Sequence, residues 1–215
     1  MSSFAAIFGR DILLALRASG GAVQGVLFFV IAALIFAIAI GPEIAMLSRL
    51  AAPIVWACAL LATLVSLERI FQSDVEDGSL DVIVETADPL ELAFLAKAAA
   101  HWATTALPLI LAAPLLGLLL NLPAAGFAPL IVSLLVGAPA LSLLGALGSA
   151  LTLSVRRAGL LITVLIAPLY APVLIFGVGA AAGDEAALMF LGAMTMFSAI
   201  IAPLAGAAAI RFNLD

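Results

Sequence analysis

Six uninterrupted apolar runs constrain the fold of this chain more than any other feature of its sequence. They cover residues 22–40, 50–67, 101–120, 127–153, 160–182 and 186–210. Each run holds about 20 residues, the length at which a helix crosses the hydrocarbon core of a bilayer. Because 66% of the residues are hydrophobic and 10% are charged, the chain cannot cover a water-soluble surface. We therefore predict an all-α integral membrane protein with six transmembrane helices in a single domain, residues 1–215.

The residues before the first run, 1–20, have the pattern of an amphipathic helix. Apolar side chains recur at steps of three and four, at Phe4, Ile7, Phe8, Ile12 and Leu16. Charged side chains occupy other positions, at Arg10, Asp11 and Arg17. The segment is too short and too charged to span a bilayer, so we predict a helix that lies in the membrane interface. The alternative is a cytoplasmic extension of the first span.

The basic residues predict the orientation of the bundle. With the N-terminus inside, seven of the eight fall on the cytoplasmic side, namely Arg10, Arg17, Arg69, Lys97, Arg156, Arg157 and Arg211. Arg49 alone falls outside. Because cytoplasmic loops carry an excess of Lys and Arg, we predict that both termini and the polar segment 68–100 are cytoplasmic.

The polar segment holds eight of the thirteen carboxylates of the chain between residues 68 and 97. So many charges are excluded from hydrocarbon, and the segment must lie in water or among the headgroups. We predict a turn at Asp77 and Gly78, and then a short helix capped by Ser79. Its apolar face comprises Leu80, Ile83, Val84 and Ala87, while Asp81 and Glu85 point elsewhere.

A second helix start follows in the same segment. Asp88 is placed to cap it, with Pro89 at the first helical position and Glu91 at the third. We predict that this helix continues through Lys97 into the third span. A segment of roughly thirty residues with its own helices is commonly functional in a compact protein.

We therefore predict that segment 68–100 is a coupling segment that docks a soluble partner; a solvated surface loop is the alternative. The residues assigned to it are Glu68, Arg69, Asp74, Asp77, Gly78, Ser79, Leu80, Asp81, Ile83, Val84 and Lys97. Asp74, Glu76 and Asp77 are expected to meet basic residues of the partner in a salt-sensitive contact. Glu68 and Arg69 are either interfacial anchors or reach Lys97, Arg156 or the partner.

Prolines and small residues are frequent inside the spans. The residues assigned to packing in the bundle or against a partner are Pro108, Pro114, Pro139, Gly145, Gly148, Pro168 and Pro172. Interior prolines predict kinked or broken helices. A stripe of small residues, Ala138, Ser142, Ala146 and Ala150, allows helices to approach closely. It favours packing within the bundle, and the alternatives are a mobile seam or contact with another membrane protein.

Several functional classes lack the residues that they need. No G-x-x-x-x-G-K-[ST] loop surrounds Lys97, the only lysine, so ATP must be hydrolysed elsewhere. The spans carry almost no ionisable groups near their centres, which disfavours an ion-coupled transporter. One histidine, His101, and one cysteine, Cys58, supply neither a catalytic set nor a metal site. His101 beside Trp102 is interpreted as an interfacial residue rather than a haem ligand.

Five segments follow one another along the chain: LERIFQSDVEDGSL, K-x-x-x-HW-x-x-T followed by LPLILAAPLLGLLL, GAPALSLLGALGSALTLSVRR, APLYAPVLIFG and the AAAIR of the tail. In this order and spacing they resemble the haem exporter protein B family of bacterial cytochrome c maturation. The similarity covers nearly the whole chain. The sequence departs from the family pattern at Ala106, where glycine is expected, and at Ala167, where leucine is frequent.

The resemblance implies the permease component of an ABC-type complex in the bacterial inner membrane. Its partners would be a separate ATPase, which is the A protein of the same system, the membrane proteins C and D, and the haem chaperone E. Haem would be a substrate of the complex rather than a cofactor of this chain. The family's role is described either as haem export to the periplasm or as ATP-driven release of the haem-loaded chaperone. A membrane adaptor without a transport path is the alternative function.

Overall fold

The computed structural model describes residues 3–17, 21–87, 89–155 and 159–214, which form helices and no strand. Its elements in order are α1 Ser3–Arg17, α2 Gly21–Ile40, α3 Ile44–Ser66, α4 Arg69–Asp77, α5 Ser79–Thr86, α6 Leu90–His101, η1 Trp102–Ala106, α7 Leu107–Leu119, α8 Ala124–Leu151, α9 Gly159–Ala181 and α10 Glu185–Leu214. Six stretches of these helices are long and apolar enough to cross a membrane. The predicted all-α fold with six spans is therefore confirmed.

The spans differ from the predicted ranges mainly at the second and third. The second span, α3, begins at Ile44 rather than at residue 50. Arg49 lies within the first turns of α3. The helix tolerates this charge because the side chain is exposed and avoids the apolar core. The third span begins at Leu90 and runs through α6, η1 and α7 to Leu119. The predicted continuation through Lys97 into this span is confirmed.

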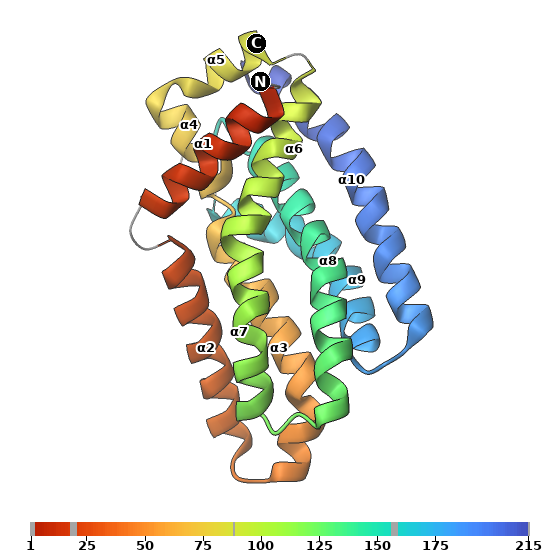
Figure 1. Ribbon diagram of the computed structural model, residues 1–215. Helices are drawn as coiled ribbons and strands as arrows, with labels where there is room; N and C mark the ends of the chain where they lie inside the picture. The colour runs from red at the N-terminus through yellow and green to blue at the C-terminus, as the bar shows by residue number, and fades with distance from the viewer. Residues whose placement is uncertain (1–2, 18–20, 88, 156–158, 215) are drawn as a thin grey trace.

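α8 is the central helix of the bundle. It contacts α3, α4, α6, α7, α9, α10 and η1, and Figure 1 shows it between the helices of both halves of the chain. In contrast, α2 lies at the edge, where only 11% of its span is buried by the rest of the chain. The apolar side chains that α2 leaves uncovered suit contact with lipid.

The chain termini lie at the same end of the bundle as α1, α4 and α5 (Figure 1). The connections between α2 and α3 and between α7 and α8 lie at the opposite end. This arrangement gathers the polar segment and α1 into one layer at one end of the spans. α1 packs mainly against α6, with Ile7 buried. The structure thus confirms a helix over Ser3–Arg17, while its position in a membrane interface stays a prediction.

The turn between α4 and α5 follows the prediction in part. Gly78 adopts the left-handed conformation with φ of 74°, which a residue without Cβ adopts at no steric cost. Ser79 is the first residue of α5 and not its cap: its hydroxyl donates to Asp74, and its backbone N–H donates to Asp77. Pro89 stands just before α6 rather than at its first position. Asp88, its predicted cap, lies outside the described residues.

Most interior prolines leave their helices continuous, so breaks at these prolines are wrong, while kinks stay a prediction. α8 continues past Pro139, and α9 continues past Pro168 and Pro172. Pro114 lies inside α7. Neighbouring helices and local adjustments can accommodate the lost hydrogen bonds.

The exception is the π-helical turn η1, just ahead of Pro108. Here the N–H of Leu107 bonds to the carbonyl of Trp102, five residues earlier. The hydroxyl of Thr104 donates a hydrogen bond to the carbonyl of Ala100, at 2.8 Å. Proline clashes with the carbonyl four residues before it, and a wider turn relieves that clash. The third span therefore contains a local irregularity between its polar and apolar halves.

The small residues of α8 are buried inside the bundle. Ala138, Ser142, Ala146 and Ala150 are each at most 4% exposed. A Cβ at Gly145 would collide with Leu67 and Tyr170, and one at Gly148 would collide with Ile166. These contacts support packing within the chain as the role of the stripe.

Candidate functional site: a buried ion network beneath an acidic surface

Asp74 lies at the centre of the layer that α1, α4 and α5 form at one end of the spans. The apolar face of α4 carries Ile70 and Phe71 inward, and Asp74 follows Ile70 by one helical turn. Its side chain is therefore buried, with 2% exposed. Its Oδ1 accepts hydrogen bonds from Arg10 Nη2 at 2.5 Å and from the hydroxyl of Ser79 at 2.9 Å.

Lys97 completes the charge balance around Asp74. Its Nζ forms an ion pair with Asp74 Oδ2, and it donates to Asp11 Oδ2 at 2.8 Å. Arg10 Nη2 in turn lies 2.8 Å from Asp11 Oδ1. Arg10, Asp11, Asp74 and Lys97, called here the ion network, thus form a closed ring of two cations and two anions. The ring joins α1, α4 and α6.

The carboxylates of the ring favour the charged form of Arg10. Burial alone would lower the pKa of Arg10, but hydrogen bonding to Asp11 and the charge of Asp74 raise it above its usual value. Lys97 lies over the ring of Phe71, 5.3 Å from the centroid, which adds a cation–π contact. Buried charges are tolerated only when they are paired in this way.

The ion network corrects two predictions. Asp74 and Lys97 are 1% and 2% exposed, so neither is available to a soluble partner, and the predicted contact of Asp74 with a partner is wrong. The sequence pattern places Arg10 and Asp11 on the polar side of an interfacial helix, yet they pair with this chain. A signal for this pairing is present in the sequence, because Lys97 is a single cation within an alanine-rich run of the third span.

The apolar face of α5 also packs inward. Leu80 and Ile83 are buried, and Val84 is half-buried. These three predicted docking residues therefore hold α5 on the bundle and do not present a surface.

The opposite side of α4 and α5 is exposed and acidic. Glu76, Asp77, Asp81 and Glu85 are all exposed, and between them Val75 and Val82 expose 40% and 58% of their surface. These six residues are called here the outer acidic surface. Sequence reasoning misses both valines because it assigns docking to the apolar face, which the bundle covers.

Glu68 and Arg69 lie at the junction between α3 and α4, and they do not pair with Lys97. Arg69 Nη2 donates to Gln24 Oε1 of α2 at 3.2 Å. Glu68 is half-buried beside the start of α9, where a Cβ on Gly159 would lie 2.9 Å from its Oε2. Arg156, a predicted partner of this pair, lies outside the described residues, as does Arg157.

His101 is buried among three helices rather than exposed on the surface of the bundle. Its Nε2 lies 2.8 Å from the hydroxyl of Ser66 on α3, and its Nδ1 lies 3.1 Å from that of Ser142 on α8. Ser66 already donates to the carbonyl of Thr63, so it accepts from Nε2–H, and Ser142 donates to Nδ1. Because both ring nitrogens are engaged, His101 holds α3, α6 and α8 together.

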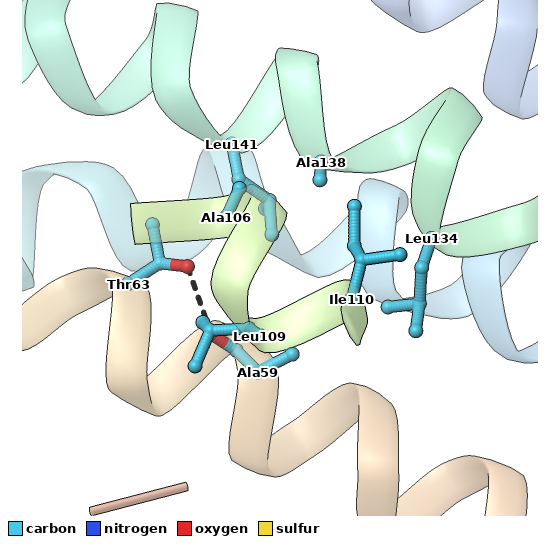
Figure 2. A pocket seen from close by; sticks show the side chains of 8 residues that line it. All are labelled: Ala59, Thr63, Ala106, Leu109, Ile110, Leu134, Ala138 and Leu141. Atoms are coloured by element: carbon cyan, nitrogen blue, oxygen red, sulfur yellow. Dashed lines mark hydrogen bonds between the residues drawn. The ribbon is translucent and has the colours of Figure 1, made fainter. Parts of the chain in front are cut away.

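A small cavity lies deeper in the bundle, between α3, α7 and α8 (Figure 2). Ala59, Thr63, Ala106, Leu109, Ile110, Leu134, Ala138 and Leu141 line it. The one hydroxyl in this lining, on Thr63, donates to the carbonyl of Ala59 at 2.8 Å. The cavity volume of about 10 Å³ is near the minimum for one water. This cavity is therefore far too small for a haem.

Comparison with known proteins identifies the family. A family model described as CcmB protein matches residues 2–213. The chain is 47% identical to heme exporter protein B of Bradyrhizobium diazoefficiens over the full length of both chains. It is 50% identical to that of Paracoccus denitrificans, covering 97% of this chain and 99% of the relative, and 39% identical to that of Escherichia coli, covering 97% and 98%. The chain belongs to the CcmB protein family.

Proposed function

We propose that this chain is the membrane permease of a haem-exporting ABC-type complex in the bacterial inner membrane. Its relatives along the whole length are named heme exporter protein B. Within that complex the chain would receive mechanical work from a separate ATPase, the A protein of the system. The membrane proteins C and D and the haem chaperone E would complete the assembly, which serves c-type cytochrome biogenesis.

The outer acidic surface carries this proposal. A helix of eight residues, α5, lies at the end of the spans with its apolar face on the bundle and its charges facing outward. Only a short connection separates α5 from α6, which continues into the third span, so a force on α5 passes directly to a transmembrane helix. Exposed valines among carboxylates suit a partner surface that offers an apolar hollow rimmed by basic side chains.

We expect neutralisation of the outer acidic surface to weaken association with the partner ATPase. The variant combines Glu76→Gln, Asp81→Asn and Glu85→Gln. Each exposed pair contributes about 0.2–1 kcal/mol, so three together weaken binding by roughly tenfold at low salt. Co-purification at increasing salt measures the effect, and wild-type binding should fall with salt towards the level of the variant.

The matched control neutralises exposed carboxylates at the other end of the bundle, in Glu43→Gln combined with Glu185→Gln. Its binding to the ATPase should equal that of the wild type. Equal binding by the outer-surface variant and the wild type at low salt would refute docking at α4 and α5.

A second function, a membrane adaptor without a transport path, is favoured by the small cavity of Figure 2. A cavity of this size between α3, α7 and α8 offers haem no route through that part of the bundle. Reconstituted complexes separate the two functions: a permease supports haem flux that depends on ATP, whereas an adaptor supports assembly and ATP hydrolysis without flux.

A further inference from the structure

The role of the ion network differs from the docking role proposed for the outer acidic surface. Every ion pair that joins described residues belongs to its ring. Yet its two most buried members, Asp74 and Lys97, each have only 2% of the side chain exposed. A partner protein cannot reach them, so their role lies inside the chain.

Asp74 is the point where four helices meet. It belongs to α4 and contacts Arg10 of α1, Ser79 of α5 and Lys97 of α6. Arg10 Nη1 also donates to the hydroxyl of Ser79, at 3.3 Å. Each of Arg10, Asp74 and Ser79 is therefore hydrogen-bonded to the other two. As a result, α5 cannot shift relative to α1 or α6 without lengthening at least one of these contacts.

Cohesion alone does not explain four charges in this ring. An apolar set of similar volume holds helices together as well or better, because it avoids the cost of removing ions from water. What a ring of alternating charges can add is registry, because each buried ion has to meet a partner of opposite charge. The ring fixes the position of α1 relative to the start of α5 and the middle of α6.

We infer that the ion network makes α1 part of the coupling machinery, with Asp74 as the positioning residue that joins α1, α5 and α6 into one rigid unit. This inference rests on the proposed function, in which α5 receives the movement of an ATPase. A displacement of α5 then moves α1 together with the third span. The exposed leucines of α1, Leu13, Leu14 and Leu16, move with it.

Hydrogen exchange on the full-length protein in nanodiscs, with Asp74→Asn, tests the inference. We expect exchange in residues 3–17 and 79–86 to rise on the order of a hundredfold, as follows from removing one partner of a buried ion pair. Exchange in α9 and α10 should be unchanged. Arg10→Gln should produce the same pattern from the other end of the ring, whereas Arg17→Gln, at an exposed cation on the same helix, should change nothing.

Two outcomes would overturn the inference. In one, Asp74→Asn loosens α4 and α5 while α1 keeps its wild-type exchange. In the other, exchange rises uniformly through all helices, which marks general unfolding. If Asp74→Asn does not accumulate, Arg10→Gln decides alone, because its guanidinium is only part-buried and its removal is milder. Unchanged exchange in α1 and α5 of that variant also overturns the inference.

A second readout separates positioning from docking. Asp74→Asn and Arg10→Gln keep the outer acidic surface, so both should still co-purify with the partner ATPase. The ATP hydrolysis that the membrane protein stimulates should nevertheless fall about tenfold, and wild-type stimulation in either variant would overturn the inference. If the wild-type chain itself fails to bind the ATPase, the proposed function fails, while the exchange experiment still decides whether the network joins α1 to α5 and α6.

Discussion

At the scale of single residues, small side chains decide how closely the helices of this bundle approach. Trp56 of α3 is fully buried, and its Nε1 donates to Ser133 of α8 at 3.0 Å. Its ring lies against two glycines, Gly137 of α8 and Gly177 of α9. The indole thus fills the space that the missing Cβ atoms leave among three spans.

We expect Gly177→Ala to destabilise the protein by about 1–3 kcal/mol, the usual cost of overpacking a dense interior. The new Cβ would lie 2.5 Å from Trp56 Cζ2, and a buried indole cannot move aside easily. The matched control is Gly192→Ala on α10, whose Cβ would meet only Val136 at an ordinary 3.9 Å. Unfolding in detergent measures both variants, and equal stability of the two would contradict the assigned role of Gly177.

The residues of the ion network show where reading the sequence fails at this scale. Arg10 and Asp74 are 64 positions apart, and Asp11 and Lys97 are 86 apart. The periodicity of a sequence indicates which face of a helix is polar. It does not indicate whether that face contacts water or the polar face of a distant helix. The pattern therefore assigns the charged face of α1 to water, although two of its members are paired inside the protein.

At the scale of elements, the hydropathy of the sequence predicts the spans because the length of a membrane helix is imposed by the bilayer. Their ends are less predictable. The predicted start of α3 is six residues too late, because Arg49 has the character of a loop residue. The prolines within the spans predict kinked or broken helices, but among those that the structure describes, only the turn before Pro108 leaves the α-helical hydrogen-bond pattern.

The junction between α4 and α5 gives a prediction at this scale. Gly78→Ala should destabilise the junction by about 1–2 kcal/mol, because φ of 74° brings a Cβ too close to the backbone. Gly78→Asn should cost less, since asparagine enters this region more readily. Gly9→Ala, within α1 and with open space around its Cβ, should cost nothing. Hydrogen exchange of α5 reports the effect, and equal protection in the Gly78→Ala and Gly9→Ala variants would contradict it.

At the scale of the whole molecule, the arrangement of the helices predicts its topology. Both termini, α4 and α5 lie at one end, and the connection between α2 and α3 lies at the other (Figure 1). Arg49 stands near the start of α3, shortly after that connection. Together with the excess of basic residues at the terminal end, this predicts a cytoplasmic outer acidic surface.

Cysteine labelling checks this orientation in a Cys58→Ala background. An impermeant maleimide should label Asp81→Cys only from the cytoplasmic side and Glu185→Cys only from the opposite side, since both positions are exposed. Cys58 is fully buried, so its replacement removes background without opening the surface. Labelling of both new cysteines from the same side, or of Asp81→Cys from outside, would reverse the topology.

The separation of the ring's members along the chain has a consequence for biogenesis. Arg10 and Asp11 leave the ribosome first, whereas Lys97 is made 86 residues after Asp11. Asp74, the partner of Arg10, is made 64 residues after it, but Asp11 lacks its partner on α6 until the start of the third span has been made. The ring is therefore complete only once α6 has been made, and α1 lacks one of its ion pairs with the rest of the bundle for most of the first half of translation.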